Sequence, residues 1–497
     1  MTGESFLFAI PLYLTPRLRP GLASLLQAPD FLHDLVAGLG SPLNVVLPEQ
    51  VADNVDEFRT VYRKHHITGD VYFAHKANRA SSFVRNLAAT SAAMDVASLG
   101  ELQHALGAGF APERIMATGP KSPEFLWLAA RSGITVNLDS RAELAQLAEL
   151  VRKFGLPKVR ILVRLCDFET SGTTVLTRVS RFGTPMRELD ALLDDVISHQ
   201  DATELIGVAY HLDTIGLAEK AAALEGCIKV MNECQRRGLR PRVVDIGGGF
   251  GVNYLDDGDQ WERWTSELTN AALGRRAPLT WQAHGYGLRG EGGTLRGALG
   301  LYPSHRPVAG PRYLDELLSL EAPTLGRPLA TLLLENLFDL YIEPGRALVD
   351  QSGTVLATVL ETRQNANGDW MVRLEMNAGD ASLEEHGVLL DPVLVERPGG
   401  DPPAVDGPTG VYLIGNLCLE ADFITRRQVF LPKLPRPGDL LAFANTAGYF
   451  MDFSADHALH QPIARKVAAF QDAGRWRWCL DEQYWPTARA NGADGQA

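Results

Sequence analysis

The stretch VYFAHKANRA (residues 71–80) joins a β-prone apolar run directly to a lysine. Residues 71–74 have the composition of a buried strand, so the strand is expected to deliver the Lys76 ammonium group into the protein interior. An unpaired charge is costly to bury, and lysine is seldom fully buried. We therefore expect Lys76 to have a chemical role. A lysine desolvated in an apolar pocket loses its proton more readily and can attack a carbonyl group to form a Schiff base.

Apolar, β-branched runs alternate with amphipathic stretches from residue 70 to residue 345. Strands joined by helical crossovers are typical of a parallel α/β protein. Eight strands also suffice to close a TIM-type (β/α)8 barrel, although an open doubly wound sheet is an alternative that strand counting leaves open. The expected strands are residues 71–76, 93–97, 114–119, 134–139, 160–165, 205–212, 243–249 and 337–345.

After residue 350 the runs become β-like and are separated by Gly, Pro, Asn and Asp, which predicts a second, mainly β domain resembling a Greek-key barrel. The Gly-, Pro- and Arg-rich segment 271–331 is interpreted as an insertion between the seventh and eighth strands. The expected organisation is an N-terminal segment (1–45) contributing to the β domain, a barrel (46–348), the C-terminal β domain (349–487) and a disordered tail (488–497).

The composition excludes several classes of function. A net charge of −13 argues against a nucleic-acid partner or an anionic membrane, because both need a basic field. No apolar run reaches the roughly 18 residues that span a bilayer. The five cysteines are odd in number and show no CxxC spacing, so neither disulfides nor a metal site are expected, and a reducing cytoplasm is the default location.

Polar residues and glycines fall at the carboxyl ends of the expected strands, which is where barrel enzymes build their sites. Lys76 follows the first strand, Asp95 ends the second, Arg164 the fifth and His211 the sixth, and Glu343 closes the eighth. Each of these residues alone is more often structural, but their shared position favours one site.

The glycine run GGGFG (247–251) offers unhindered backbone N–H groups suited to a phosphate. It is not a dinucleotide fingerprint, because Val252 stands where the third glycine of GxGxxG is required. Arg346 would add a charge-assisted bond to the same phosphate. A reactive lysine, a phosphate cradle and a carboxylate facing a ring nitrogen together indicate pyridoxal phosphate.

Eight ordered motifs carry a resemblance that spans roughly residues 40–460. They are FAHKAN, DVASLGEL, SRFG, YHLDT, DIGGGFG, EPGR, GNLCLEADF and GDLLAFANTAGYF. Together they resemble the fold-type III pyridoxal-phosphate decarboxylases, the group that contains diaminopimelate, ornithine and arginine decarboxylases. The resemblance implies pyridoxal 5′-phosphate as cofactor, α-decarboxylation of an L-amino acid, and a head-to-tail homodimer with shared active sites.

The resemblance also implies a role for each matching residue. Lys76 would bind the cofactor covalently, with Asp95 supporting the lysine region; His211 would stack on the ring, Arg164 would lie near its phenolic oxygen, and Glu343 would pair with its nitrogen. Gly248, Gly249, Arg346 and Tyr449 would hold the phosphate, with Thr214 where the family usually has serine. Cys418 would reach the active site of the partner subunit, as a catalytic residue alongside Lys76, His211 and Glu343.

Two departures from the family pattern bear on the substrate. In members that act on diamino acids, an acidic residue directly follows the cysteine and binds the distal ammonium group. Here that position is Leu419, and Glu420 one step further would point to the opposite face of a strand. Asp422 matches a later family aspartate and could partly compensate. We therefore expect a substrate other than a simple free diamino acid, as in specialised-metabolite or siderophore synthesis.

The second departure is the insertion, which holds seven arginines against four acidic residues. A basic segment near the barrel rim could meet a distal carboxylate or an acyl conjugate, whereas a solvated surface excursion is the alternative. Two further functions stay open: an amino-acid racemase or epimerase on the same fold, and a non-catalytic regulatory homologue. Glu343 argues against the racemase, where an arginine usually faces the ring nitrogen, and the retained Lys76 and Cys418 argue against the non-catalytic homologue.

Overall fold

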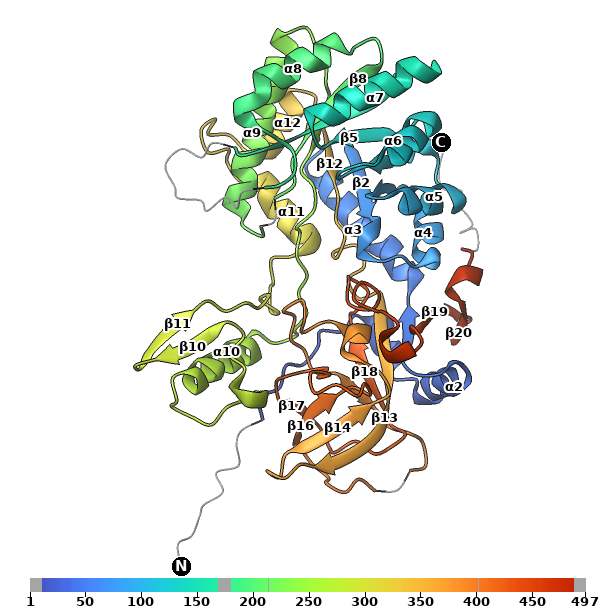
Figure 1. Cartoon of the computed structure of the whole chain (residues 1–497), viewed down its shortest axis with the longest axis vertical. Coiled ribbons are helices and arrows are strands. Elements are labelled where there is room, and N and C mark those ends of the chain that lie inside the picture. The colour runs from blue at the N-terminus through green and yellow to red at the C-terminus, as the bar shows by residue number, and fades with distance from the viewer. Residues whose placement is uncertain (1–10, 169–179, 213, 401, 487–497) are drawn as a thin grey trace, which may run out of the picture. The chain divides into compact units, whose positions relative to one another are not determined.

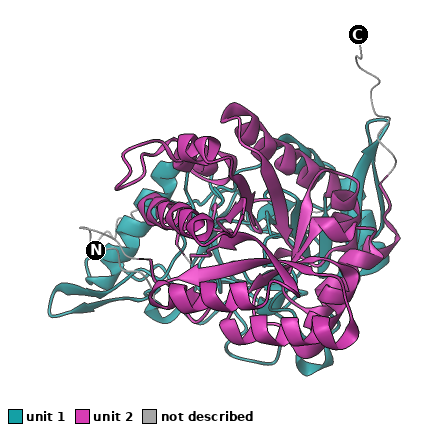
Figure 2. Cartoon of the chain, turned by 90° about the horizontal axis from the view of Figure 1, so that it is seen from above, with its two compact units in different colours: residues 1–47, 252–307, 350–480 teal, residues 48–251, 308–349, 481–497 magenta. Residues whose placement is uncertain are grey.

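The computed structural model describes residues 11–168, 180–212, 214–400 and 402–486. The chain divides into two compact units, which Figure 2 colours separately. The barrel unit is the described part of residues 48–251, 308–349 and 481–497, and the sheet unit is the described part of residues 1–47, 252–307 and 350–480. Each unit therefore contains segments that are far apart in the sequence.

In the described part of the barrel unit, eight parallel strands form a closed ring. Their order is β5-β4-β3-β2-β12-β9-β8-β6, and β5 pairs with β6 to complete the circle. This closure confirms the TIM-type barrel and excludes the open doubly wound sheet. The strands are β2 (Gly69–Ala74), β3 (Ala93–Val96), β4 (Ile115–Ala117), β5 (Thr135–Leu138), β6 (Val159–Cys166), β8 (Thr203–Ala209), β9 (Val243–Asp245) and β12 (Asp339–Ile342), with the two-residue β7 (Thr184–Pro185) beside β6.

The helices of the barrel unit begin and end at residues with clear local signals. Helix α7 starts where the Ser140 hydroxyl accepts a bond from the Glu143 amide and ends at Gly155, which has left-handed backbone angles. Helix α6 is capped in the same way by Ser122 and Gly133. The helices are α3 (Pro48–Lys64), α4 (Ser81–Ala88), α5 (Leu99–Gly107), α6 (Pro123–Ser132), α7 (Arg141–Phe154), α8 (Leu189–Ser198), α9 (Leu217–Arg236), α11 (Gly310–Ser319) and α12 (Leu329–Glu335).

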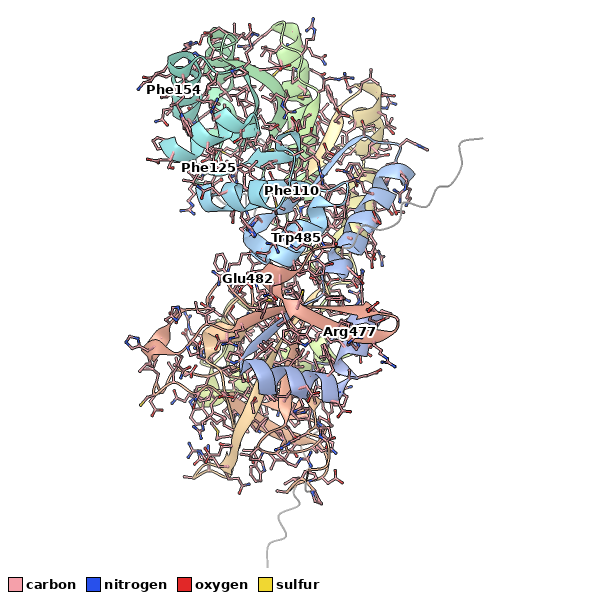
Figure 3. The ribbon with its side chains drawn as sticks, turned by 90° about the vertical axis from the view of Figure 1, so that its right-hand side faces the viewer. Phe110, Phe125, Phe154, Arg477, Glu482 and Trp485 are labelled. Carbon is pink, nitrogen blue, oxygen red and sulfur yellow. The ribbon has the colours of Figure 1, made fainter. Side chains whose placement is uncertain are left out.

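The barrel interior is filled by one side chain from each of several strands. The buried layer consists of Tyr72, Ala93, Met116, Leu162, Ala209 and Val243, which belong to six different strands. Packing of this kind makes the barrel a solid core rather than a pore. Figure 3 labels three phenylalanines of this unit: Phe110, which follows α5, and Phe125 of α6 are buried, whereas Phe154, the last residue of α7, is 50% exposed.

The sheet unit is mainly β, as expected. Its strand order is β17-β16-β14-β13-β1-β19-β20, and β18 pairs with both β13 and β15. The N-terminal strand β1 (Leu43–Val46) lies between β13 and β19, which ties the start of the chain into the sheet. The other strands are β13 (Gly353–Gln364), β14 (Trp370–Leu374), β15 (Val393–Val395), β16 (Thr409–Ile414), β17 (Val429–Leu431), β18 (Leu440–Ala444), β19 (Arg465–Asp472) and β20 (Arg475–Leu480). Figure 1 shows helix α2 (Pro29–Leu39) in this unit, which also contains α1 (Pro20–Leu26) and α10 (Gly258–Ala272).

The segment expected as a barrel insertion, residues 271–331, is instead divided between the two units. Its first part belongs to the sheet unit, because the Trp281 amide donates to the Arg426 carbonyl (2.6 Å) and the Gln428 amide to the Leu279 carbonyl (3.1 Å). This part forms the hairpin β10 (Leu288–Glu291) and β11 (Thr294–Gly297). Its second part contributes α11 and α12 to the barrel unit. The segment is therefore not a single insertion in the barrel unit.

The expected C-terminal boundary also changes. Residues 481–486 belong to the barrel unit, where the Asp481 carboxylate accepts bonds from the Ser81 and Ser82 amides at the start of α4 (2.7 and 3.0 Å). Arg85 of the same helix lies 4.4 Å from the ring centroid of Trp485, which Figure 3 labels with Glu482. The expected tail, residues 488–497, lies outside the described residues. None of the described helices is long and apolar enough to cross a membrane.

The barrel core predicts the effect of a cavity. Leu162 is fully buried in the interior layer, so Leu162→Ala should lower the free energy of unfolding by about 2–5 kcal/mol. The matched control is Leu334→Ala on α12, whose side chain is 40% exposed, and its effect should stay within about 0.5 kcal/mol. Urea unfolding followed by circular dichroism measures both, and equal midpoints for the two variants would contradict the assignment of the core.

Candidate functional site

The barrel unit brings most of the predicted site residues to one rim. Because all eight strands are parallel, their carboxyl ends meet at one end of the barrel. Contacts confirm that neighbouring strand ends are close: the Glu343 amide donates to the Gly247 carbonyl (2.9 Å), and Glu343 Oε2 lies 3.5 Å from His211 Nδ1. The rim residues of this group are Lys76, Asp95, Arg164, His211, Thr214, Gly248, Gly249, Glu343 and Arg346.

Lys76 is exposed rather than buried, so the expectation of an ammonium group inside an apolar interior is wrong. The strand β2 ends at Ala74, and Lys76 lies in the short 3-10 turn His75–Ala77 beyond it. The neighbouring His75 takes the buried position, at 3% exposure. Lys76 nevertheless acts electrostatically on the site, because its charge lowers the pKa of both Asp95 and Glu343.

Two carboxyl groups share the floor of the site. Burial raises the pKa of Asp245 well above its ordinary value, and the neighbouring Glu343 charge raises it further. Burial also acts to raise the pKa of Glu343, but His211, Lys76 and a hydrogen bond with Asp245 outweigh this effect and lower it. Asp245 therefore keeps its proton and Glu343 carries the negative charge, which suits Glu343 to a cationic ring nitrogen.

Asp95 is a third buried carboxyl group at this rim. Burial, followed by the Glu343 charge, raises its pKa to about 8, while Lys76 and a hydrogen bond from the Thr118 hydroxyl oppose the shift. A carboxyl group with this value is mostly protonated near neutral pH. A positive charge placed close to Asp95 and Glu343 would favour the ionised form of both.

The glycine loop leaves no room for side chains. A Cβ atom at Gly247 would lie 2.6 Å from His211 Nδ1, and one at Gly248 would lie 2.8 Å from the Glu343 carbonyl oxygen. Gly249 has φ +86°, which favours glycine. The Gly248 amide donates to His211 Nδ1 (3.3 Å), so the histidine ring is held against the loop. Burial lowers the pKa of His211 despite the opposing effect of Glu343.

Three further predicted residues belong to the same unit. Arg164 lies on β6, where its Nη1 is 3.5 Å from Asp139 Oδ1 and its guanidinium is 4.9 Å from the Phe182 ring centroid. The Thr214 hydroxyl accepts a bond from the Gly216 amide (3.0 Å) just before α9. Arg346 lies in the turn that follows β12, three residues after Glu343.

These residues fit pyridoxal 5′-phosphate. The side-chain-free glycine loop provides backbone donors for a phosphate, as in other phosphate-binding loops. The buried, ionised Glu343 provides a partner for a protonated pyridine, and the exposed Lys76 provides an accessible amine. The barrel unit thus offers groups that suit the phosphate, the ring nitrogen and the aldehyde of the cofactor.

The predicted residues of the cysteine loop lie in the sheet unit. Cys418, Leu419 and Glu420 are all exposed, and Leu419 is 57% exposed. Asp422 is buried, and its carboxylate accepts bonds from the Ala378 and Leu417 amides (2.9 and 2.8 Å). Asp422 therefore braces the loop from within, and its part in binding the substrate stays a prediction.

Tyr449 also lies in the sheet unit, after β18. Its backbone φ of 75° is left-handed, which is unusual for a residue with a side chain. Its ring packs edge-on against Phe453, with centroids 5.9 Å apart. Such a backbone conformation is often retained at functional sites.

Sequence reasoning missed two buried groups next to the site, Asp245 and Lys220. Asp245 ends β9 in the run VVD, so an acid closing a buried strand was an available signal. Lys220 lies in the first turn of α9 and is fully buried. Because Lys220 lies on an amphipathic helix among charged neighbours, the sequence did not indicate that its side chain is buried.

Comparison with known proteins identifies the relatives of this chain. Residues 49–289 match the family model described as the pyridoxal binding domain of pyridoxal-dependent decarboxylases. The uncharacterized protein y4yA of Sinorhizobium fredii is 28% identical over 93% of this chain and 94% of its own. The diaminopimelate decarboxylase of Methanothermobacter thermautotrophicus is 24% identical over 85% of this chain and 86% of its own. The structure of diaminopimelate decarboxylase from M. jannaschii in complex with L-lysine has the same fold, with a TM-score of 0.67, 17% identity, and 92% and 93% coverage.

The chain therefore carries, at residues 49–289, the pyridoxal binding domain of the fold-type III pyridoxal-phosphate-dependent decarboxylases. It is accordingly an amino-acid decarboxylase whose cofactor is pyridoxal 5′-phosphate.

The raised pKa of Asp95 predicts a pH effect on the cofactor-free protein. The folded chain binds this proton up to about pH 8, whereas the unfolded chain releases it near pH 4. Between these values the unfolded state holds fewer protons, so stability falls as the pH rises. Asp95→Asn cannot ionise and should gain stability relative to wild type across this window, by at most about 1.4 kcal/mol per pH unit.

Urea midpoints of the cofactor-free proteins across the window measure this gain. Asp201→Asn is the control, because Asp201 is exposed and Arg152 holds its pKa at about 2, below the window. A pH-independent difference between Asp95→Asn and wild type would refute the assignment.

Proposed function

We propose that this enzyme removes the α-carboxylate of an L-amino acid whose distal end carries no free ammonium group. Pyridoxal 5′-phosphate, when bound, supplies a protonated ring that withdraws electrons from the substrate Cα. The protein's task is to hold that ring, keep its nitrogen protonated and deliver a proton to Cα after CO2 leaves. The substrate choice rests mainly on Leu419, which stands where diamino-acid enzymes have an acid.

The proposed roles of the barrel residues follow from their chemistry. Lys76 would bind the cofactor aldehyde through its amine, and the same amine would return a proton to Cα. Glu343 holds the proton on the ring nitrogen, because its own pKa is lowered. Asp95 supports the Lys76 charge, and His211 packs on the ring beside the glycine loop. The proposed phosphate and phenolic-oxygen ligands are Arg164, Thr214, Gly248, Gly249, Arg346 and Tyr449.

The rigidity of the cysteine loop supports the substrate proposal. The Asp422 carboxylate occupies the loop interior, and a Cβ at Gly415 would lie 2.1 Å from Asp422 Oδ2. The Gly415 amide also donates to the Asp422 carbonyl (2.8 Å). A loop held at both ends by one residue has little freedom to bring Glu420 into the place of Leu419. The distal end of the substrate would then meet an aliphatic side chain.

Aromatic packing beside this loop also supports a substrate without a distal ammonium group. Trp281 lies 5.0 Å from the Phe423 ring centroid and 5.5 Å from that of Tyr412. Phe423 follows Leu419 by four residues, and apolar surroundings favour an uncharged acyl group over a charged one. Amino acids acylated in this way occur in specialised-metabolite and siderophore synthesis, which is where we place the reaction.

A distal carboxylate receives less support. Four of the seven arginines in residues 271–331 already pair with glutamates, at Arg276, Arg289, Arg312 and Arg327. The segment is also divided between the two units, so its arginines do not form one basic loop. We therefore prefer an acyl conjugate to a dicarboxylic amino acid.

Racemisation on the same fold is the second candidate. It requires reprotonation at Cα without loss of CO2, which a weaker electron sink favours. The ionised, buried Glu343 maintains a protonated ring and so supports decarboxylation. Release of CO2 with unchanged chirality in recovered substrate would distinguish the two reactions.

The substrate proposal predicts a gain of function. Leu419→Glu should raise kcat/KM for lysine, ornithine and meso-diaminopimelate by about tenfold or more relative to Nε-acyl-lysine, because a desolvated ion pair contributes on the order of 1.5–3 kcal/mol. Wild type should prefer the acylated substrates. CO2 release measures both, and Glu420→Gln, on the adjacent exposed residue, is the control expected to leave this ratio unchanged.

A wild-type enzyme that favours free diamino acids, or a Leu419→Glu variant with an unaltered ratio, would refute the substrate proposal while leaving decarboxylation intact.

We also propose a head-to-tail homodimer in which Cys418 completes the active site of the partner subunit. Cys418 is free and exposed on a braced loop, as a residue reaching another subunit must be. Its thiol would then serve as a second proton donor to Cα. Symmetric pairing gives two equivalent sites per dimer.

Shared sites predict complementation. Lys76→Ala and Cys418→Ala homodimers should each be nearly inactive, whereas subunits mixed and exchanged under mild denaturation should recover about a quarter of wild-type activity, because half of the dimers then hold one intact site of two. Analytical ultracentrifugation gives the oligomeric state. Mixed dimers that form without regaining activity would show that Lys76 and Cys418 act within one chain.

A further inference from the structure

Lys220 is a buried cation that the assigned chemistry does not use. Its side chain is fully buried in the first turn of α9. The other buried lysine of the barrel unit, Lys121, has a carboxylate partner, Glu143, at 3.1 Å. Within the described residues, no carboxylate lies within 4 Å of Lys220 Nζ. A buried ammonium group without a counter-ion is costly.

The helix position adds to this cost. The first turn of a helix carries a partial positive charge, so a lysine there is repelled by the helix dipole. Burial lowers the pKa of Lys220 to about 8, although Glu343 and Asp245 both act to raise it. Because burial and the helix dipole both disfavour the charged form of Lys220, a compensating negative partner is expected.

The ammonium group of Lys220 contacts the glycine loop. Nζ donates a hydrogen bond to the Gly248 carbonyl oxygen. It lies 5.1 Å from the Phe250 ring centroid and 3.2 Å from the position that a Cβ of Gly249 would occupy. The loop is thus held between His211, which accepts the Gly248 amide, and Lys220, which binds the Gly248 carbonyl.

This bond fixes the direction of a backbone donor. In a trans peptide the carbonyl and the following N–H point in opposite directions. Because Lys220 binds the Gly248 carbonyl from the buried side, the Gly249 N–H is directed away from Lys220. Gly249 is also the exposed residue of the three glycines. The amide is therefore presented for an external acceptor.

We propose that Lys220 is a positioning residue of the cofactor's phosphate site. Its ammonium group locks the Gly248–Gly249 peptide so that the Gly249 N–H serves the phosphate, and its charge adds a positive potential behind the loop. The phosphate dianion is then the counter-ion that the protein itself does not supply to Lys220. The inference rests on the proposed assignment of the glycine loop to the phosphate.

Binding measurements with three vitamers test this inference without relying on activity. Pyridoxal 5′-phosphate has both the aldehyde and the phosphate, pyridoxine 5′-phosphate lacks the aldehyde, and pyridoxal lacks the phosphate. Dissociation constants of the cofactor-free protein follow from quenching of tryptophan fluorescence. Lys220→Met should weaken both phosphorylated ligands by about ten- to hundredfold, the usual effect of one charge-assisted bond, and change pyridoxal binding by less than about twofold.

Two variants separate charge from general damage. Lys229→Met removes the same charge from an exposed position of the same helix, where Lys229 pairs with Glu225, and should leave all three constants unchanged. Lys220→Gln keeps a donor without the charge and should show an intermediate loss for the phosphorylated ligands. Should Lys220→Met not fold, Lys220→Gln decides the question by the same comparison.

The possible outcomes are distinct. Equal weakening of pyridoxal and the phosphorylated ligands would show that Lys220 only supports packing, and unchanged phosphate binding would show that it has no positioning role; either result overturns the inference. Failure of the wild-type protein to bind any of the three vitamers would instead overturn the proposed function.

Discussion

The closing pair of strands is the constraint on which the barrel depends. Val136, Asn137 and Leu138 of β5 pair in parallel with residues 161–163 of β6, and this register turns eight strands into a ring. Closure removes both sheet edges and places every carboxyl end at one rim. Side chains that are more than 250 residues apart in the sequence, such as Lys76 and Glu343, thereby act on one another. The chemistry of the site is a consequence of this geometry.

The same rim brings together several carboxyl groups whose simultaneous ionisation would be unfavourable without a bound ligand. Glu343, Asp245 and Asp95 are all buried, and the Glu343 charge raises the pKa of both other carboxyl groups. The barrel tolerates them by keeping protons on Asp245 and Asp95 and by placing Lys76 and His211 nearby. Lys220 is the opposite case, since among the described residues no carboxylate lies within 4 Å of its ammonium group. A ligand with a cationic ring and an anionic phosphate would complement both excesses at once.

Much of the barrel could be predicted from the sequence because its signals are local. Strand periodicity and residues such as Ser140 and Gly155 mark where each element begins and ends, and all eight expected strands are present. Lys76 shows where such local signals fail. The strand before it ends at Ala74, and the short 3-10 turn that follows places the Lys76 side chain at the exposed rim instead of in the interior. The division of residues 271–331 depends on main-chain bonds between segments almost 150 residues apart, such as Trp281 with Arg426, which no local pattern encodes.

Asp422 shows why a motif match alone is a weak guide to specificity. From the sequence it is one more acid near the cysteine and could serve the substrate. In the structure both of its oxygens accept backbone amides of the same unit, and its carboxylate fills the space beside Gly415. An acid used in this way fixes the conformation of the loop, whereas Leu419 is the exposed side chain that the loop offers to its surroundings. Under the proposed function, changes at 419 would alter the substrate without disturbing the loop, because bracing and recognition then fall to different residues.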